Sequence, residues 1–237
     1  MDIAPYYRIK CVFVGEPSVG KSSIIHLVHH EEQNKNVEPT IGIGFANTQI
    51  NLEEYPISNP SKLPHFYKEK SEVNSERNQL VSLYIWDTAG SLRFFNIVKS
   101  YLRDVDICFL VFDLTRRSTF DDVVRWKQEV DNSSEPIYIL VGTKSDLKNP
   151  EVSIKEIQDL GQKWNIKYYI LSAVQFDSYT SVRKMLYNSV REFHENLLKL
   201  EHQKKKLPDH VLTSYYEKKF DLVDFYDTSR GSFCCYQ

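Results

Sequence analysis

The sequence is poor in the residues that mark unstructured, disulfide-bonded or membrane-spanning chains. Its 237 residues include eight glycines, nine prolines and four cysteines. So few glycines and prolines argue against a low-complexity chain. No window approaches the roughly 18 apolar residues of a transmembrane helix. The start, MDIAPYYRIK, lacks the basic first residues and the long apolar run of a signal peptide, so we expect none. It also lacks the Met-Gly that N-myristoylation requires.

An excess of charge of one sign is missing as well. Lys and Arg total 30 against 32 Asp and Glu, which leaves a net charge of -2. We therefore expect no nucleic-acid partner. Hydrophobic residues make up 41% of the chain, so a substantial core is possible, and the length fits one domain with extensions or two small domains. Cys11 and Cys108 lie in apolar runs, which predicts buried, reduced thiols.

Strand-like and helix-like segments alternate along the chain. This alternation predicts an α/β fold with a mainly parallel sheet, helices on both faces, and ligands at the carboxyl ends of the strands. Ser153 and Glu156 predict a capping box at the start of one helix. The expected strands are 7–14, 80–86, 107–114, 137–146 and 166–173, and the expected helices are 21–30, 120–130, 153–164 and 181–199.

One polar, proline-containing segment does not fit a compact domain. It lies at about residues 54–77, between two strand-like segments. Hairpin connections usually take ~2–5 residues, so we expect an insertion that joins two antiparallel strands. Two interpretations stay open here: a tolerated surface excursion, or a contact with a specific partner.

The segment GEPSVGKS, residues 15–22, matches GxxxxGK[ST] between an apolar strand and a helix. In this motif successive backbone N–H groups and the helix N-terminus face the phosphates. Lys21 would neutralise the β- and γ-phosphates, and the Ser22 hydroxyl would bind Mg²⁺. The predicted phosphate-binding residues are Gly15, Ser18, Val19, Gly20, Lys21, Ser22 and Ser23.

Two further segments predict that the base is guanine. GTKSD, residues 142–146, follows a buried strand, and Asp146 there can accept hydrogen bonds from guanine N1–H and the exocyclic amine. The Lys144 stem can lie over the purine plane. One strand later, LSA offers the Ala173 N–H to guanine O6. The predicted base-binding residues are Thr143, Lys144, Asp146, Ser172, Ala173 and Val174.

Two more segments predict contacts that depend on a γ-phosphate. In WDTAG, Asp87 at a strand end can hold Mg²⁺ through a water, and the Gly90 N–H can meet the γ-phosphate. Thr40, in EPTIGIGF, can offer its hydroxyl to Mg²⁺ and its N–H to the γ-phosphate. The predicted metal ligands are thus Ser22, Thr40 and Asp87. Losing the γ-phosphate would release both loops, which is the behaviour of a switch.

Together these motifs resemble the Ras superfamily of small GTPases and, within it, the Rab family. IGIGF, SLYIW, RFFNI, SYLRD and LVFDLT look like Rab segments, nearest to those of Golgi-associated Rabs. The resemblance covers about residues 8–195, with the insertion interrupting it. It implies a P-loop domain with a six-stranded, mainly parallel sheet and about five helices, GTP/GDP cycling with Mg²⁺, exchange factors, GTPase-activating proteins, effectors and Rab escort protein. A domain at 6–200 and a variable tail at 201–237 are expected.

The sequence departs from that family at the residues closest to catalysis. Ser91 stands where the family has a glutamine that orients the attacking water, and a serine is too short to reach it. Pro17 is unusual in the phosphate loop, since proline lacks an N–H. Val174 stands where lysine is common. With Lys21, Thr40 and Ser91 as the catalytic candidates, we expect slow intrinsic hydrolysis.

The segment CCYQ ends the sequence and carries Cys234 and Cys235. It resembles the di-cysteine ending on which Rab prenyltransferase places two geranylgeranyl groups, and two chains anchor a protein stably. Read as C-a-a-X, the same ending would give one farnesyl group on Cys234. Either reading predicts attachment to a membrane, and the Rab resemblance implies the cytoplasmic face of an endomembrane, of Golgi or endosomal vesicles, with a cytosolic pool.

The leading hypothesis is therefore a Rab-like GTP switch in vesicle trafficking. The alternative is a GTP-binding scaffold with negligible hydrolysis, controlled by nucleotide exchange. A P-loop ATPase or nucleotide kinase conflicts with TKSD and LSA.

Overall fold

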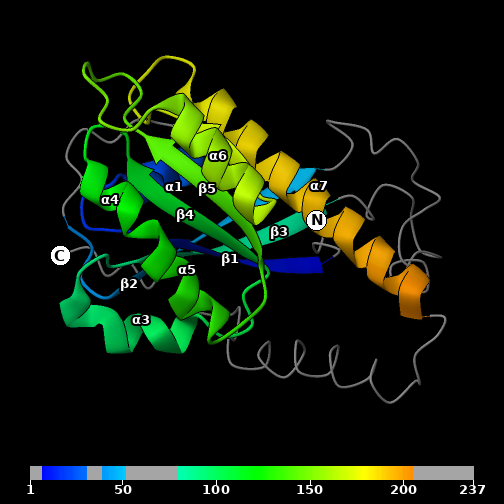
Figure 1. Cartoon of the computed structure of the whole chain (residues 1–237). Coiled ribbons are helices and arrows are strands. Elements are labelled where there is room, and N and C mark those ends of the chain that lie inside the picture. Colours follow the sequence, from blue (N-terminus) through cyan, green and yellow to red (C-terminus); the bar gives the residue numbers. More distant parts are fainter. Residues whose placement is uncertain (1–6, 31–38, 52–79, 205–237) are drawn as a thin grey trace. The chain divides into compact units, whose positions relative to one another are not determined.

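The computed structural model describes residues 7–30, 39–51 and 80–204 (Figure 1). Six strands form one sheet in the order β2-β3-β1-β4-β5-β6, in which β2 and β3 are antiparallel and the other neighbours are parallel. This confirms the predicted fold class. The strands are β1 Tyr7–Val14, β2 Ile43–Asn51, β3 Leu80–Thr88, β4 Ile107–Asp113, β5 Ile137–Thr143 and β6 Lys167–Ile170.

The helices of the described residues are α1 Lys21–His30, α3 Phe95–Tyr101, α4 Arg117–Asp121, α5 Val123–Asp131, α6 Ile154–Trp164 and α7 Ser178–Lys204, with a 3₁₀ turn, η5, at Leu92–Phe94. With α4 and α5 taken together, these are the five helices expected. None of them combines the length and the apolarity needed to cross a membrane. Ser153 caps α6 in the predicted box, accepting from the Glu156 N–H while the Glu156 side chain accepts from the Ser153 N–H.

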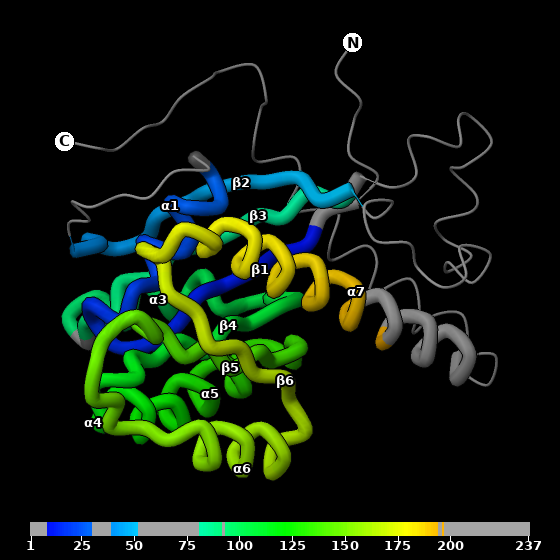
Figure 2. Tube along the Cα trace, turned by 90° about the horizontal axis from the view of Figure 1, so that it is seen from above, coloured from blue at the N-terminus to red at the C-terminus, as the bar shows by residue number. Residues whose placement is uncertain are grey.

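Helices cover both faces of the sheet because side chains along each strand alternate between two cores. On β1, Ile9 and Phe13 belong to the core beneath α1 and α7, whereas Val12 and Val14 belong to the core beneath α3, α5 and α6. Figure 2 separates these two helical layers. Every residue of β4 is buried, as its continuous apolar sequence predicted.

Several boundaries differ from the sequence-based expectation. The helix expected at 120–130 is two helices that meet at Asp122, whose N–H is shared by the carbonyls of Ser118 and Phe120. Its periodicity could not reveal this junction, because Phe120 and Val123 are both buried. The strands expected to reach 146 and 173 end at Thr143 and Ile170, which leaves Lys144–Asp146 and Leu171–Ala173 in loops.

The β2–β3 hairpin carries the predicted insertion. Asn51 pairs with Leu80 at one end of the hairpin, and Ile43 pairs with Thr88 at the other. The two strands are antiparallel, as predicted. The insertion itself lies outside the described residues, as do Cys234 and Cys235 of the predicted lipid-bearing tail.

Candidate functional site

The loop between β1 and α1 holds the buried amine of Lys21. The Nζ of Lys21 donates to the carbonyl oxygens of Gly15 and Glu16, at 2.8 Å each. Burial lowers the pKa of Lys21 to about 8, although Asp87 and Glu16 oppose that shift. The residues between turn sharply, with positive φ at Ser18 (60°) and Gly20 (100°). The loop therefore points its lysine inward and places α1 directly behind it.

Three hydroxyl and carboxylate groups from separate segments meet beside Lys21. The Ser22 hydroxyl lies 2.5 Å from Asp87 Oδ2 and 2.7 Å from the Thr40 hydroxyl, which itself lies 3.1 Å from Asp87 Oδ2. The other carboxylate oxygen, Asp87 Oδ1, is buried without a hydrogen-bond partner. Burial raises the pKa of Asp87, against the hydrogen bonds from Ser22 and Thr40 and the charge of Lys21.

This oxygen cluster fits a hard divalent cation. Mg²⁺ takes oxygen ligands, and proteins usually hold it through one or two carboxylates while the nucleotide phosphates supply the rest. The unpartnered Asp87 Oδ1 is a buried acceptor that such an ion or its water would satisfy. The structure thus brings together the three residues that the sequence predicted as metal ligands.

The segment that follows β3 packs tightly against the phosphate loop. The Ala89 N–H donates to the Gly42 carbonyl at 2.9 Å, which joins this segment to the loop that carries Thr40. A Cβ on Gly90 would lie 2.4 Å from the carbonyl carbon of Glu16 and 2.5 Å from Pro17 N. Only glycine allows this close approach between the segment after β3 and the phosphate loop.

Ser91 immediately precedes the η5 turn. Its carbonyl accepts from the Phe94 N–H at 3.0 Å, and its hydroxyl accepts from the Arg93 N–H at 3.4 Å. The hydroxyl therefore bonds within its own turn. No part of this arrangement extends a polar group as far as a glutamine would.

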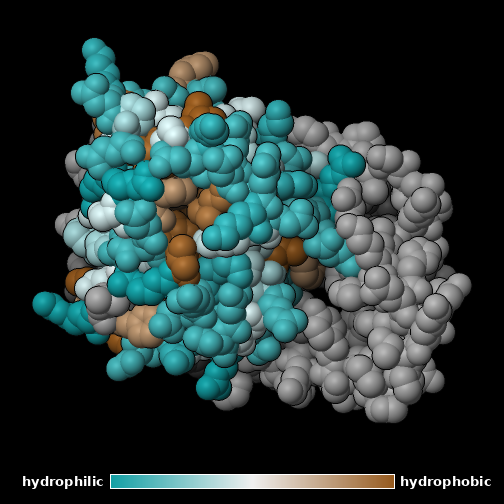
Figure 3. Space-filling model, in the orientation of Figure 1, coloured by the Kyte–Doolittle hydropathy of each residue, from teal (hydrophilic) through white to brown (hydrophobic). Residues whose placement is uncertain are grey.

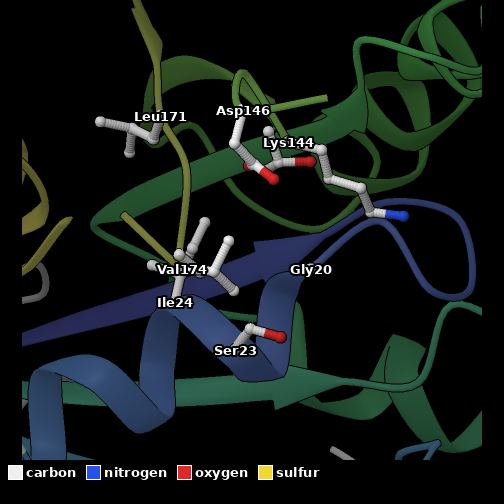
Figure 4. A pocket seen from close by; sticks show the side chains of 9 residues that line it. Gly20, Ser23, Ile24, Lys144, Asp146, Leu171 and Val174 are labelled. Atoms are coloured by element: carbon white, nitrogen blue, oxygen red, sulfur yellow. The ribbon is translucent and has the colours of Figure 1, made fainter. Parts of the chain in front are cut away.

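A cavity opens at the carboxyl ends of β5 and β6. Figure 4 shows Ser23 and Ile24 of α1 on one side of it and Asp146 on the other. The Ser172 hydroxyl is buried beside the cavity and accepts from the Val174 N–H at 3.1 Å. The residues that line the cavity are Gly20, Ser23, Ile24, Thr143, Lys144, Asp146, Leu171, Ala173 and Val174, of which all but Ile24 and Leu171 were predicted to bind nucleotide.

Several residues around the phosphate loop were not predicted from the sequence. Glu16 Oε1 accepts from Arg125 Nη2 at 2.5 Å and from Trp126 Nε1 at 3.1 Å. Asp113, at the end of β4, binds Lys144 Nζ at 2.7 Å and Arg116 Nε at 3.0 Å. Asp113 could have been predicted as a site residue, because it is a charged residue at the end of a fully buried strand. The sequence around Arg116 and Arg125 gives no comparable indication.

Exposed apolar side chains lie near the two segments that the sequence predicts to sense a γ-phosphate. Ile41 is 81% exposed and Phe45 is 55% exposed. The Phe45 ring lies 4.9 Å from that of Trp86, which lies 4.8 Å from that of Tyr101. Figure 3 shows one face of the molecule, where apolar areas are small and separated by hydrophilic surface. An aromatic row of this kind suits a protein partner.

The chain is also similar in sequence to known proteins. The Ras family matches residues 10–195 of the chain. Ras-related protein YPT3 of Nicotiana plumbaginifolia is 29% identical over 172 residues, which cover 71% of this chain and 68% of that protein.

Proposed function

The chain belongs to the Ras family of small GTPases, and on that premise we propose that it is a Rab-like, Mg²⁺-dependent GTP switch in membrane trafficking with slow intrinsic hydrolysis. Similarity to a Ypt-type protein supports the Rab-like assignment. In this class most catalysis consists of positioning the phosphates and stabilising their charge.

The observation that carries the proposal is the convergence of Ser22, Thr40 and Asp87. These residues come from α1, from the loop before β2 and from the end of β3, yet their oxygens lie within 3.1 Å of one another. A bound Mg²⁺ would neutralise phosphate charge there. Thr40 itself lies outside the regular elements, in the loop before β2. Losing the γ-phosphate and its ion would free Thr40 and Gly90, and the surface around Phe45 would change with them.

Slow hydrolysis is proposed because of Ser91. Its side chain is short, and its hydroxyl already accepts from Arg93 N–H. The chain therefore offers no residue at this position that could orient a water against the γ-phosphate. The same observation favours the second candidate, a GTP-binding scaffold with negligible turnover that exchange factors control. The two candidates differ only in the rate of the hydrolytic step.

The partners proposed are those of a membrane-anchored Rab. An exchange factor and a GTPase-activating protein would act on the two γ-phosphate-sensing segments, and effectors would bind the aromatic row of Phe45, Trp86 and Tyr101. Rab escort protein and prenyltransferase would act on Cys234 and Cys235. This would place the protein on the cytoplasmic face of an endomembrane, with a cytosolic pool.

The first test is the nucleotide that copurifies with the full chain. Denaturing the purified protein and chromatographing the supernatant should give GTP or GDP in near-stoichiometric amount, and EDTA should accelerate its release. ATP, or no nucleotide with no GDP binding on titration, would refute the proposal. Single-turnover hydrolysis of loaded GTP, with and without cell extract, then separates the slow switch from the scaffold.

A further inference from the structure

Asp113 is the centre of a polar network beside the phosphate loop, and the side of the loop that faces this network is called its outer side. It ends β4 and its side chain is 1% exposed. Its Oδ1 accepts from the Thr115 N–H (2.9 Å) and hydroxyl (2.7 Å), and its Oδ2 accepts from Arg116 Nε and Lys144 Nζ. Burial works to raise the pKa of Asp113, but the hydrogen bonds from Lys144 and Thr115 outweigh it and lower the pKa. Asp113 is thus a charged, fully bonded anchor.

Arg116 extends from this anchor to the phosphate loop. While its Nε binds Asp113, its Nη2 donates to the Pro17 carbonyl at 2.9 Å. The planar guanidinium fixes the angle between these two bonds, which an ammonium group could not do. Arg116 therefore holds one particular carbonyl of the loop on the outer side.

The bond from Arg116 to the Pro17 carbonyl also determines the direction of the Ser18 N–H, which belongs to the same peptide group. The chain has no cis peptide bond among its described residues, and in a planar trans peptide the C=O and N–H point in opposite directions. Since the Pro17 carbonyl points outward to Arg116, the Ser18 N–H points away from Arg116, to the inner side of the loop. Proline gives the loop no N–H of its own at residue 17, so the Ser18 N–H is the first donor available after Glu16.

The backbone conformation of Ser18 is strained, so this orientation of the Pro17–Ser18 peptide is energetically unfavourable. Its φ is 60°, in the left-handed region that glycine adopts readily and other residues rarely do. The Glu16 side chain is held by Arg125 and Trp126, but those bonds do not act on the Pro17–Ser18 peptide. The hydrogen bond from Arg116 to the Pro17 carbonyl acts on this peptide directly and opposes its relaxation.

We propose that Arg116 is a positioning residue for nucleotide binding, which turns the Ser18 N–H toward the phosphates by holding the Pro17 carbonyl. The inference rests on the proposed function, since it names what orients part of the same phosphate site. Lys144 binds the same oxygen of Asp113. Asp113 therefore anchors both the loop after β5, which is predicted to bind the base, and, through Arg116, the phosphate loop.

The test compares Arg116→Ala with Arg117→Ala. The Arg117 guanidinium binds Asp121 and Glu156 and is 44% exposed, against 42% for Arg116, which makes it a matched control. The full chain is loaded with a fluorescent GDP, and release into excess GDP is followed in Mg²⁺ buffer. Arg116→Ala should release GDP about tenfold faster than wild type, the expected loss for one hydrogen bond to a charged group. Arg117→Ala should stay within about twofold.

Two more variants distinguish positioning from a general loss of structure. In the Arg116→Ala background, Ser18→Gly should slow release again by at least about threefold, because glycine holds φ 60° without strain. Arg116→Lys should fall between wild type and Arg116→Ala, because an ammonium cannot hold both partners in the same geometry.

Equal release rates for Arg116→Ala and Arg117→Ala, or no rescue by Ser18→Gly, would overturn the inference while GDP binding by the wild type leaves the proposed function standing. A wild type that binds no guanine nucleotide would overturn both.

Discussion

Replacing Gly90 with alanine should separate GTP sensing from nucleotide binding. Gly90 lies directly against the phosphate loop, where an added Cβ would meet the Glu16 carbonyl carbon at 2.4 Å and the Gly15 oxygen and Pro17 nitrogen at 2.5 Å. These are backbone atoms and cannot rotate away. Ordinary carbon contacts lie at ~3.5–4.0 Å, so the segment after β3 must retreat by about 1 Å or more.

A retreat of that size removes a hydrogen bond from the Gly90 N–H to a γ-phosphate, because N–H···O bonds tolerate only ~2.7–3.2 Å. A hydrogen bond to a charged group contributes ~1.5–3 kcal/mol, so the preference for GTP over GDP should fall by roughly 10- to 150-fold. GDP has no γ-phosphate, and we expect its contacts to come from the loop before α1 and from the cavity at β5 and β6. Its affinity should change by less than about twofold.

The assay measures dissociation of fluorescent GDP and of a fluorescent, non-hydrolysable GTP analogue from wild type and Gly90→Ala. Gly161→Ala is the control, since it makes the same change on α6, where the nearest atom to the new Cβ is the Ile166 oxygen at 3.1 Å. Gly161→Ala should keep the wild-type ratio of the two rates. An unchanged ratio in Gly90→Ala would refute the reasoning, because it would mean that the γ-phosphate does not depend on this close approach.

Three further changes have defined outcomes. Ser91→Gln should raise single-turnover GTP hydrolysis at least about tenfold, since it restores a group that can orient water; equal rates would contradict the proposed cause of slow turnover. Asp87→Asn should make GDP release insensitive to EDTA, measured as the ratio of release rates with and without Mg²⁺, and a preserved ratio would exclude Asp87 as a metal ligand. The hydrogen bond from Arg117, with those from Ser153, lowers the pKa of Glu156 from 4.5 to about 2. Its stabilising effect is present above pH 4.5 and lost as the pH falls toward 2, so the gap in urea midpoint between wild type and Glu156→Gln should close over that window. A gap independent of pH would argue against this ion pair.

The sequence predicted the parts of the site in which the functional residues lie next to their loop or strand in the chain. Lys21 and Ser22 follow their loop directly, and Asp146 follows its strand, so spacing alone places each at the right edge of the sheet. Parallel order brings the carboxyl ends of β1 and β3 to one edge, and the antiparallel β2 begins at that edge, which is how Ser22, Asp87 and Thr40 come to meet.

The contacts around the phosphate loop could not be predicted in this way. The bond from Arg116 to Pro17 joins residues 99 positions apart, and that from Trp126 to Glu16 joins residues 110 apart. Nothing in the local pattern of either partner specifies the other, because the pairing depends on how α4 and α5 pack on the sheet. The division of the 120–130 helix at Asp122 was hidden because burial continues across the junction, with Phe120 and Val123 both buried.

The pairing of Asn51 with Leu80 makes this end of the β2–β3 hairpin a natural place for the chain to change length. The sheet is paired directly on either side of residues 52–79, and by loop-closure entropy a connection of that length costs about 1.7 kcal/mol more than a hairpin loop of ~4 residues. The opposite end of the same strands, at Ile43 and Thr88, lies ~25 Å away along the hairpin, beside the nucleotide site. Evolution could therefore lengthen or shorten the chain here almost without cost to the switch. The same junction is where a reporter domain or a pair of new chain termini could be introduced.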